Sequence, residues 1–234
     1  MNLYSCRSIS LNYIKYGETS IIAKLFTEKK GLQSFIIKGI RSVNSKKKLV
    51  CFQPMQLAKI TANYFDKKNL QNLKNISIYK KDISINQNPK KILLSLFISE
   101  VLSKLLRDNV EDKKLFEYVW KTKEDIISND IKDKNFVLLF LLNISVFFGF
   151  PPLKKNMSYP FFDMKKGMFV KEKSSNTISE ESSCYLKSLL LYEECSLNRE
   201  KRKNLLDIII NYYKIQEHEL KNLTSHLIID SILV

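Results

Sequence analysis

The chain has 234 residues, of which 44% are hydrophobic and 27% are charged, and its formal net charge is +15. This composition excludes a disordered chain and is typical of one large folded domain or two smaller ones. We expect no export signal, because residues 1–20 alternate polar with apolar side chains, and no membrane span, because the longest apolar run, residues 136–150, is too short.

Residues 3–80 have the alternation and turn signals of short antiparallel strands. The predicted strands cover residues 4–8, 21–25, 32–37, 49–60 and 75–79. Gly17 and Gly31 mark turns, residues 41–48 form a basic loop, and Pro54 is expected at an edge or a bulge. About five strands in this stretch predict a small barrel or sandwich.

After Pro89 the apolar residues recur with a helical period, and the rest of the chain is predicted to be mostly helical. Predicted helices cover residues 89–105, 112–127, 134–148, 177 onward, 198–217 and 225–233. Thr177 and Glu180 have the spacing of a capping box, and Asn198 is a second start signal. Residues 150–176 interrupt this pattern with a small hairpin. The chain is therefore predicted to be α+β, with domains at 1–80 and 81–234 and an irregular insertion at about 150–176.

Residue types that carry chemistry are scarce. The four cysteines show no C-x-x-C pair, which favours a reducing cytoplasm over a disulfide framework and gives no zinc knuckle. His218 and His226 are eight residues apart and share no helix face with a cysteine. With five glycines, no phosphate-binding glycine loop can be formed. Adjacent carboxylates such as Glu180 and Glu181 fit a solvated surface better than a two-metal nuclease site. We expect neither an enzyme nor a bound cofactor or metal.

The positive charge is concentrated at the N-terminus. Residues 1–80 contain 15 Lys or Arg against Glu18, Glu28 and Asp66, whereas the other 154 residues are nearly balanced. A codon bias toward lysine explains part of the total, because only five basic residues are Arg, but it does not explain the scarcity of acids in one third of the chain. The distribution predicts a phosphate-binding surface on the N-terminal domain.

The order of several N-terminal motifs resembles the RecO family. These motifs are Tyr16-Gly17-Glu18-Thr19-Ser20, Thr27 to Gly31, Lys38-Gly39-Ile40-Arg41-Ser42 with Ser45, and Gln53-Pro54. Residues 112–116 and 148–151 are also similar to that family. The resemblance implies an OB-fold followed by a helical domain, in a bacterial, cytoplasmic and nucleoid-associated protein. It also implies a recombination mediator in DNA repair that binds single- and double-stranded DNA, anneals complementary strands and, with RecR, loads RecA onto DNA coated by single-strand-binding protein. Many members carry a four-cysteine zinc module, whereas residues 149–175 contain no cysteine, so the hairpin aromatics Phe161, Phe162 and Phe169 are expected in its place.

Annealing requires neutralisation of two phosphate backbones, which a lysine surface achieves without sequence preference. The candidate DNA-binding residues are Lys29, Lys30, Lys38, Arg41, Lys46, Lys47 and Lys48. Aromatic residues interleaved with these cations are candidates for base stacking, namely Phe35, Phe52 and Tyr64.

The acidic, apolar-ended tail of single-strand-binding protein is assigned to the helical domain, at a basic rim beside the apolar face of Leu205, Leu206 and Ile209. The rim consists of Arg199, Lys201, Arg202 and Lys203. Two other interpretations remain open from the residues alone: another OB-type binder, such as an RNA-binding or ribosome-associated factor, and a nuclease.

Overall fold

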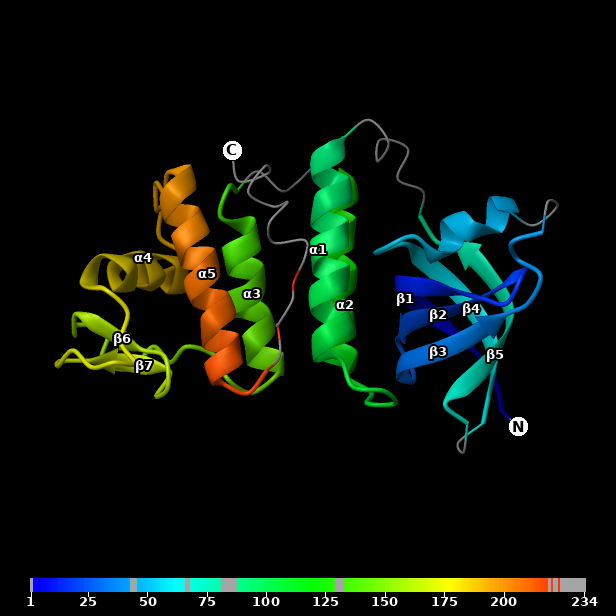
Figure 1. Cartoon of the computed structure of the whole chain (residues 1–234), viewed down its shortest axis with the longest axis horizontal. Helices are drawn as coiled ribbons and strands as arrows, with labels where there is room; N and C mark the ends of the chain where they lie inside the picture. The colour runs from blue at the N-terminus through cyan, green and yellow to red at the C-terminus, as the bar shows by residue number, and fades with distance from the viewer. Residues whose placement is uncertain are drawn as a thin grey trace. The chain divides into compact units, whose positions relative to one another are not determined.

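The computed structural model describes residues 2–42, 46–65, 68–80, 88–128, 133–218, 220 and 223. The chain divides into two compact units, Met1–Asp130 and Ile131–Val234. Figure 1 shows the elements of each unit. Within the described ranges, none of the helices combines the length and the apolar character that crossing a membrane requires.

The first unit contains a closed five-stranded barrel in the order β1-β2-β3-β5-β4. The strands are β1 (Asn2–Tyr16), β2 (Ser20–Thr27), β3 (Gly31–Ile37), β4 (Leu57–Tyr64) and β5 (Leu70–Ile78). The long β1 pairs with β2 along one edge and with β4 along the other, and this double pairing closes the barrel. Among the described strands of the barrel, only the pair of β3 and β5 is parallel. The arrangement confirms the predicted OB-type barrel.

The predicted strand at 49–60 is wrong in its first half, because residues Lys46–Phe52 form a 3-10 helix, η1. Phe52 is completely buried and joins Leu49 in the core of the barrel. Side chains three residues apart lie on the same side of a 3-10 helix, so both can face this core. A strand would direct Leu49 and Phe52 to opposite faces.

Two helices pack on the barrel and extend the first unit beyond residue 80. Helix α1 (Pro89–Leu105) begins at Asn88, whose side chain accepts a hydrogen bond from the Lys90 N–H, and α2 (Lys113–Ser128) follows. The Ser99 hydroxyl of α1 donates to the Leu11 carbonyl of β1. Phe116 of α2 meets Phe26 of β2 edge-on, with ring centroids 5.3 Å apart. The change of periodicity near residue 80 therefore marks the end of the barrel, while the compact unit also includes α1 and α2.

The second unit consists of α3 (Phe136–Phe147), α4 (Glu180–Leu191), α5 (Arg199–Ile215) and the hairpin of β6 (Phe161–Asp163) and β7 (Met168–Val170). Helices α3 and α5 lie side by side, and the Tyr213 hydroxyl of α5 donates to the Leu141 carbonyl of α3 (Figure 1). Helix α3 is buried on most sides, as its apolar sequence predicts.

The start of α4 differs from the prediction, because its N-cap is Ser179 and not Thr177. The Ser179 hydroxyl accepts a hydrogen bond from the Ser182 N–H. The Thr177 hydroxyl instead donates to the Ser174 carbonyl and closes a turn before the helix. Asn198 is the N-cap of α5, as predicted. The predicted helix at 225–233 lies outside the described residues.

Candidate nucleic-acid interface on the barrel

Three lysines surround a pocket at the point where β3 and β5 separate. The parallel pairing of these strands ends at Ile36 with Asn72. A pocket of about 130 Å³ lies next to this point, with the cations Lys38, Lys48 and Lys74 around apolar side chains of both strands. Ammonium groups around an apolar floor can hold phosphates while bases contact the floor.

Lys74 owes its position to an irregularity in β5. Thr61 of β4 pairs with Asn75, but its neighbour Ala62 pairs with Leu73, so Lys74 is the extra residue of a β-bulge. A bulge bends a strand and changes the direction of a side chain. The bulge thus adds an exposed lysine to the pocket.

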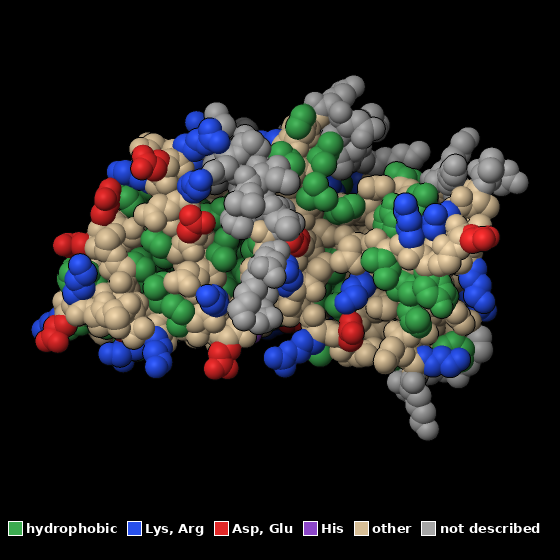
Figure 2. Space-filling model, in the orientation of Figure 1, with side chains coloured by type: hydrophobic (Ala, Val, Ile, Leu, Met, Phe, Trp, Pro, Cys, Tyr) green, Lys and Arg blue, Asp and Glu red, His purple; other side chains and the backbone are tan. Residues whose placement is uncertain are grey.

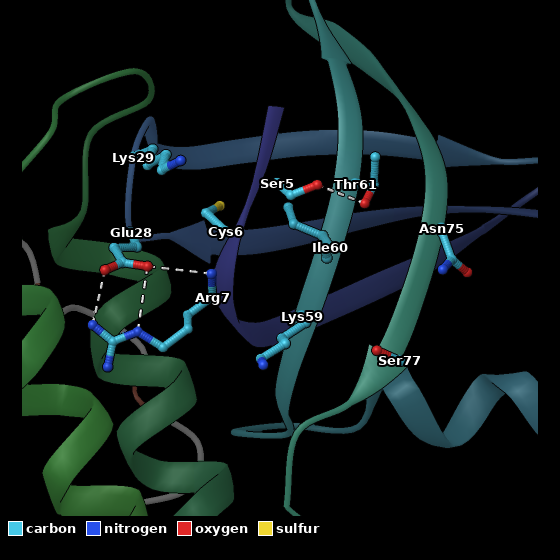
Figure 3. A pocket seen from close by; sticks show the side chains of 10 residues that line it. All are labelled: Ser5, Cys6, Arg7, Glu28, Lys29, Lys59, Ile60, Thr61, Asn75 and Ser77. Carbon is cyan, nitrogen blue, oxygen red and sulfur yellow. Dashed lines mark hydrogen bonds and ion pairs between the residues drawn. The ribbon is translucent and has the colours of Figure 1, made fainter. Parts of the chain in front are cut away.

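A larger groove of about 440 Å³ crosses the outer faces of β1, β4 and β5 (Figure 3). Four of its side chains are short and polar, namely Ser5, Thr61, Asn75 and Ser77, and the Ser5 and Thr61 hydroxyls form a 2.8 Å hydrogen bond. Lys29 and Lys59 supply positive charge. Hydroxyls, amides and ammonium groups of this kind make most contacts to phosphate oxygens.

Asn75 lines both the pocket and the groove, so the two hollows adjoin on β5. The cations of both then form one basic path on the barrel, consisting of Lys29, Lys38, Lys48, Lys59 and Lys74. Figure 2 shows one face of each unit, and on this face the first unit carries blue side chains and few red ones. The path has the positive charge expected of a surface that follows a nucleic-acid backbone.

The carboxylate of Glu28, which also lines the groove, is paired with Arg7. The Arg7 guanidinium donates to Glu28 at 2.9 Å and also to Glu117 of α2. It lies 5.0 Å from the ring centroid of Trp120. The hydrogen bonds that Arg7 donates lower the pKa of Glu28, and donation to the carboxylates of Glu28 and Glu117 raises the pKa of Arg7. Arg7 therefore neutralises Glu28 and joins β1 to α2, whereas Lys29 and Lys59 provide the charge of the groove.

Cys6 also lines the groove, but its thiol is not activated as a nucleophile. Cys6 is buried, and this burial raises the pKa of its thiol. A protonated thiol is a poor nucleophile and a poor metal ligand. Within the described ranges, no group of three or more His, Cys, Asp or Glu side chains could hold a metal ion.

The predicted DNA-binding residues have different environments. Lys38 and Lys48 lie at the pocket, and Lys29 lies at the adjoining groove. Lys30 lies over the Tyr64 ring, and the Arg41 side chain donates to the Gly17 carbonyl at 3.1 Å. The side chains of Lys46 and Lys47 lie outside the described residues. The role of all seven in DNA binding stays a prediction.

Two of the three stacking candidates are wrong. Phe35 and Phe52 have no exposed surface and belong to the core of the barrel, so no base can reach them in the folded protein. Tyr64 is half-buried, and the Lys30 ammonium lies 4.9 Å from its ring centroid. It keeps the combination of a flat ring and a cation that stacking on a base requires.

Sequence reasoning missed Lys59 and Lys74. The alternation of residues 57–62 was the available signal for Lys59, because it places this lysine on the outer face between the buried Ala58 and Ile60. Lys74 could not be found in this way, because the bulge interrupts the alternation of β5.

The rim proposed on α5 is also wrong in its central part. Arg202 is 5% exposed, and its guanidinium donates to the Leu197 carbonyl. The ammonium of Lys201 contacts Glu181 at 3.1 Å. The apolar face beside them is closed, because its three residues are buried in the second unit: Leu205, Leu206 and Ile209. Arg199 and Lys203 are exposed but have no open apolar pocket of these residues beside them.

The insertion does not fit a zinc module. Residues 150–176 offer no cysteine or histidine, and the carboxylate of Asp163 accepts hydrogen bonds from the Lys165 and Lys166 N–H groups. Phe162 and Phe169 are buried with their ring centroids 5.2 Å apart, and Phe162 contacts Tyr212 of α5. An aromatic cluster therefore attaches the hairpin to the helices. Phe161, the third predicted aromatic residue, is half-buried.

Comparisons with known proteins point to one protein family. The family model "Recombination protein O N terminal" matches residues 1–81. The chain is 30% identical to a protein named DNA repair protein RecO from Flavobacterium psychrophilum, over 88% of this chain and 89% of the relative. It is 31% identical to a protein of the same name from Bacteroides fragilis, with the same two coverages. A third such protein, from Azobacteroides pseudotrichonymphae, is 26% identical over 98% of this chain and 99% of the relative.

Proposed function

Since this chain belongs to the RecO family of DNA repair proteins, we propose that it is a recombination mediator that binds DNA through the basic path on its barrel. The observation that supports this proposal most directly is the pocket with Lys38, Lys48 and Lys74 around its apolar floor. The barrel holds these lysines together although they come from distant parts of the sequence. They would contact phosphates of any sequence, as a mediator that acts along genomic DNA requires.

The proposed mechanism needs no catalytic group. Two strands repel each other through their phosphates, and a protein that neutralises the phosphates lowers this barrier to pairing. The bases of a strand held along its backbone remain able to pair. We infer annealing of complementary strands from this chemistry.

The proposal also includes the protein partners of this chain and its location in the cell. We infer that RecR and single-strand-binding protein act with this chain, and that RecA is loaded indirectly, because these roles belong to the family that it resembles. We also infer a bacterial cytoplasmic location at the nucleoid. A pull-down with purified RecR and single-strand-binding protein tests the two direct contacts.

The barrel assignment is tested with a triple variant of the full chain, Lys38→Gln, Lys48→Gln and Lys74→Gln. Its matched control removes three lysines of the first unit that line neither hollow: Lys15→Gln, Lys90→Gln and Lys114→Gln. Loss of about three phosphate contacts should weaken binding of a single-stranded oligonucleotide by about 10- to 100-fold at physiological salt. The control should lose much less affinity. Equal losses in the two variants would contradict the barrel assignment.

Two further assays separate this function from its alternatives. A mediator should speed the annealing of complementary DNA strands, whereas an RNA-binding factor should bind RNA in preference and leave annealing unchanged. A nuclease would cut the DNA when a divalent metal is added. Cleavage that is absent from a metal-free control would overturn the proposal.

A further inference from the structure

The second unit carries a groove beside its hairpin, and all the residues that line it belong to this unit. The groove has a volume of about 410 Å³ and is formed by β7, the residues after it and the loop before β6. Tyr159, Lys166, Lys171 and Lys173 are among its lining residues. Residues 150–176 contain six lysines and two carboxylates, so this segment is more basic than the rest of its unit.

The two carboxylates of the segment have unequal effects on the groove. Asp163 is 4% exposed, and one of its oxygens accepts hydrogen bonds from the Lys165 and Lys166 N–H groups at 2.9 Å each. Its charge is thus directed into the hairpin turn. Glu172 is exposed and lies at the groove between Lys171 and Lys173. The exposed charges of the groove are therefore predominantly positive.

The groove also has an aromatic wall. The Lys171 ammonium lies 5.3 Å from the centroid of the Tyr159 ring, and this ring is half-buried. A cation beside an aromatic face is a combination that binds nucleic acid, because the cation meets phosphate and the ring offers a surface to a base.

Several contacts to α5 hold the hairpin in place. Gln216 donates to the Met164 carbonyl at 2.8 Å. Gly167 lies so close to Tyr212 that an added Cβ would be 2.9 Å from the Tyr212 hydroxyl oxygen. The backbone of the hairpin that carries these lysines is therefore held in one position. A preformed site of this kind loses less conformational entropy on binding than a loop that must first be ordered.

We propose that this groove binds a second strand of single-stranded nucleic acid while the barrel holds the first. The inference rests on the proposed function, since it assumes that the barrel binds DNA. It gives each chain two separate strand-binding surfaces, one in each unit. Two such surfaces would allow one chain to neutralise both partners of an annealing reaction.

An acidic peptide is a weaker match to this groove. Peptide recognition uses a deep apolar pocket for an anchoring side chain. The large apolar residue of this hairpin strand, Phe169, is completely buried and closed to a ligand, whereas Met168 and Val170 are half-buried. A polyanion with flat bases fits the lysines and Tyr159 better.

The test uses the full chain and two non-complementary DNA oligonucleotides with different dyes, each about ten nucleotides long, close to the site size of one OB-fold. The hairpin variant is Lys166→Gln, Lys171→Gln and Lys173→Gln. The matched control removes three other lysines of the same unit: Lys134→Gln, Lys203→Gln and Lys214→Gln. Thermal unfolding verifies that all variants fold.

The wild-type chain and the control should bind two oligonucleotides per chain, and the hairpin variant should bind one. The affinity of the remaining site should change less than about twofold, because the barrel is intact. Two oligonucleotides on the hairpin variant, or one on the wild type, would overturn the inference. If the hairpin variant keeps both strands but loses binding of a glutamate-rich peptide, the inference is also overturned and the groove is assigned to acidic peptides. The triple variant Lys38→Gln, Lys48→Gln and Lys74→Gln tests the barrel in the same assay. If it keeps both strands, the barrel assignment fails, and this result differs from the one that overturns the groove assignment.

Discussion

Gly31 and Val110 lie in direct backbone contact, and a Cβ built on Gly31 would be only 2.0 Å from the Val110 carbonyl oxygen. Gly31 begins β3 with φ of 61°, in the left-handed region. Nearby, the Asn109 N–H donates to the Leu32 carbonyl at 3.1 Å, and Gln33 donates to the Asn109 side chain. The turn that carries Lys29 and Lys30 is therefore fixed against the segment between α1 and α2.

The contact predicts that Gly31→Ala will strongly destabilise the protein. The added methyl group meets backbone that cannot move aside easily, and alanine is also strained at positive φ. We expect a loss of about 2–4 kcal/mol in the free energy of unfolding. Gly39→Ala is the control, since Gly39 has φ of 71° but nothing within 4 Å of its Cβ position, and it should lose about 1 kcal/mol. Urea unfolding measures both, and equal losses would refute the close contact.

Much of the fold could be predicted from local pattern. Turn glycines and alternation located the first three strands, and the 3.6-residue period located α1, α2 and α3. The short 3-10 helix could not be predicted, because Leu49 to Phe52 is a continuous apolar run with no period. Its conformation depends on the end of the barrel that Phe52 fills, which is tertiary information.

The candidate site was less predictable, for the same reason. Phe35 and Tyr64 both lie near lysines in the sequence, yet one is completely buried and the other is half-buried. Burial depends on which face of the barrel each strand position takes. Lys38 and Lys74 are distant in sequence and meet only because β3 pairs with β5. The charge distribution predicted which domain carries the candidate site, but closure of the barrel determines which residues form this site.

The pairing of Glu28 with Arg7 predicts a specific dependence of stability on pH. The folded pKa of Glu28 is lowered, so the pairing contributes stability above the unfolded pKa of about 4.3, and this stability is lost as the pH falls through the folded pKa. Glu28→Gln should lower the free energy of unfolding by about 1 kcal/mol at neutral pH. It should also flatten the decline of stability below about pH 4. Glu18→Gln, at an exposed position, is the control. Parallel acid curves for wild type and Glu28→Gln would contradict the prediction.

The aromatic cluster of the hairpin predicts that the second unit is stable without zinc. Phe162→Ala should lower the free energy of unfolding by about 3–5 kcal/mol, because it empties a buried aromatic site. Phe161→Ala, at the half-buried neighbouring position, should cost less than about 1.5 kcal/mol. A chelator should leave the Tm of the wild-type protein unchanged. Stoichiometric zinc in the purified protein, or a fall in Tm on chelation, would disprove this account.

The last prediction concerns Tyr64, the one stacking candidate that is not buried in the core. Its ring meets Tyr4 edge-on, with an interplanar angle of 89°, and the Lys30 ammonium lies 4.9 Å from its centroid. Tyr64→Ala should weaken binding of single-stranded DNA by about 5- to 150-fold, since stacking of one base contributes about 1–3 kcal/mol. Tyr64→Phe keeps the ring and should bind like the wild type.

The salt dependence of binding separates the roles of Tyr64 and Lys30. Stacking releases no counterions, so Tyr64→Ala should leave the slope of log affinity against log salt unchanged. Lys30→Gln removes a phosphate contact and should reduce the steepness of that slope by about 0.7. Fluorescence anisotropy at several salt concentrations measures both quantities. If Tyr64→Ala binds as tightly as Tyr64→Phe, no base stacks on this ring, and Lys30 acts there through its charge alone.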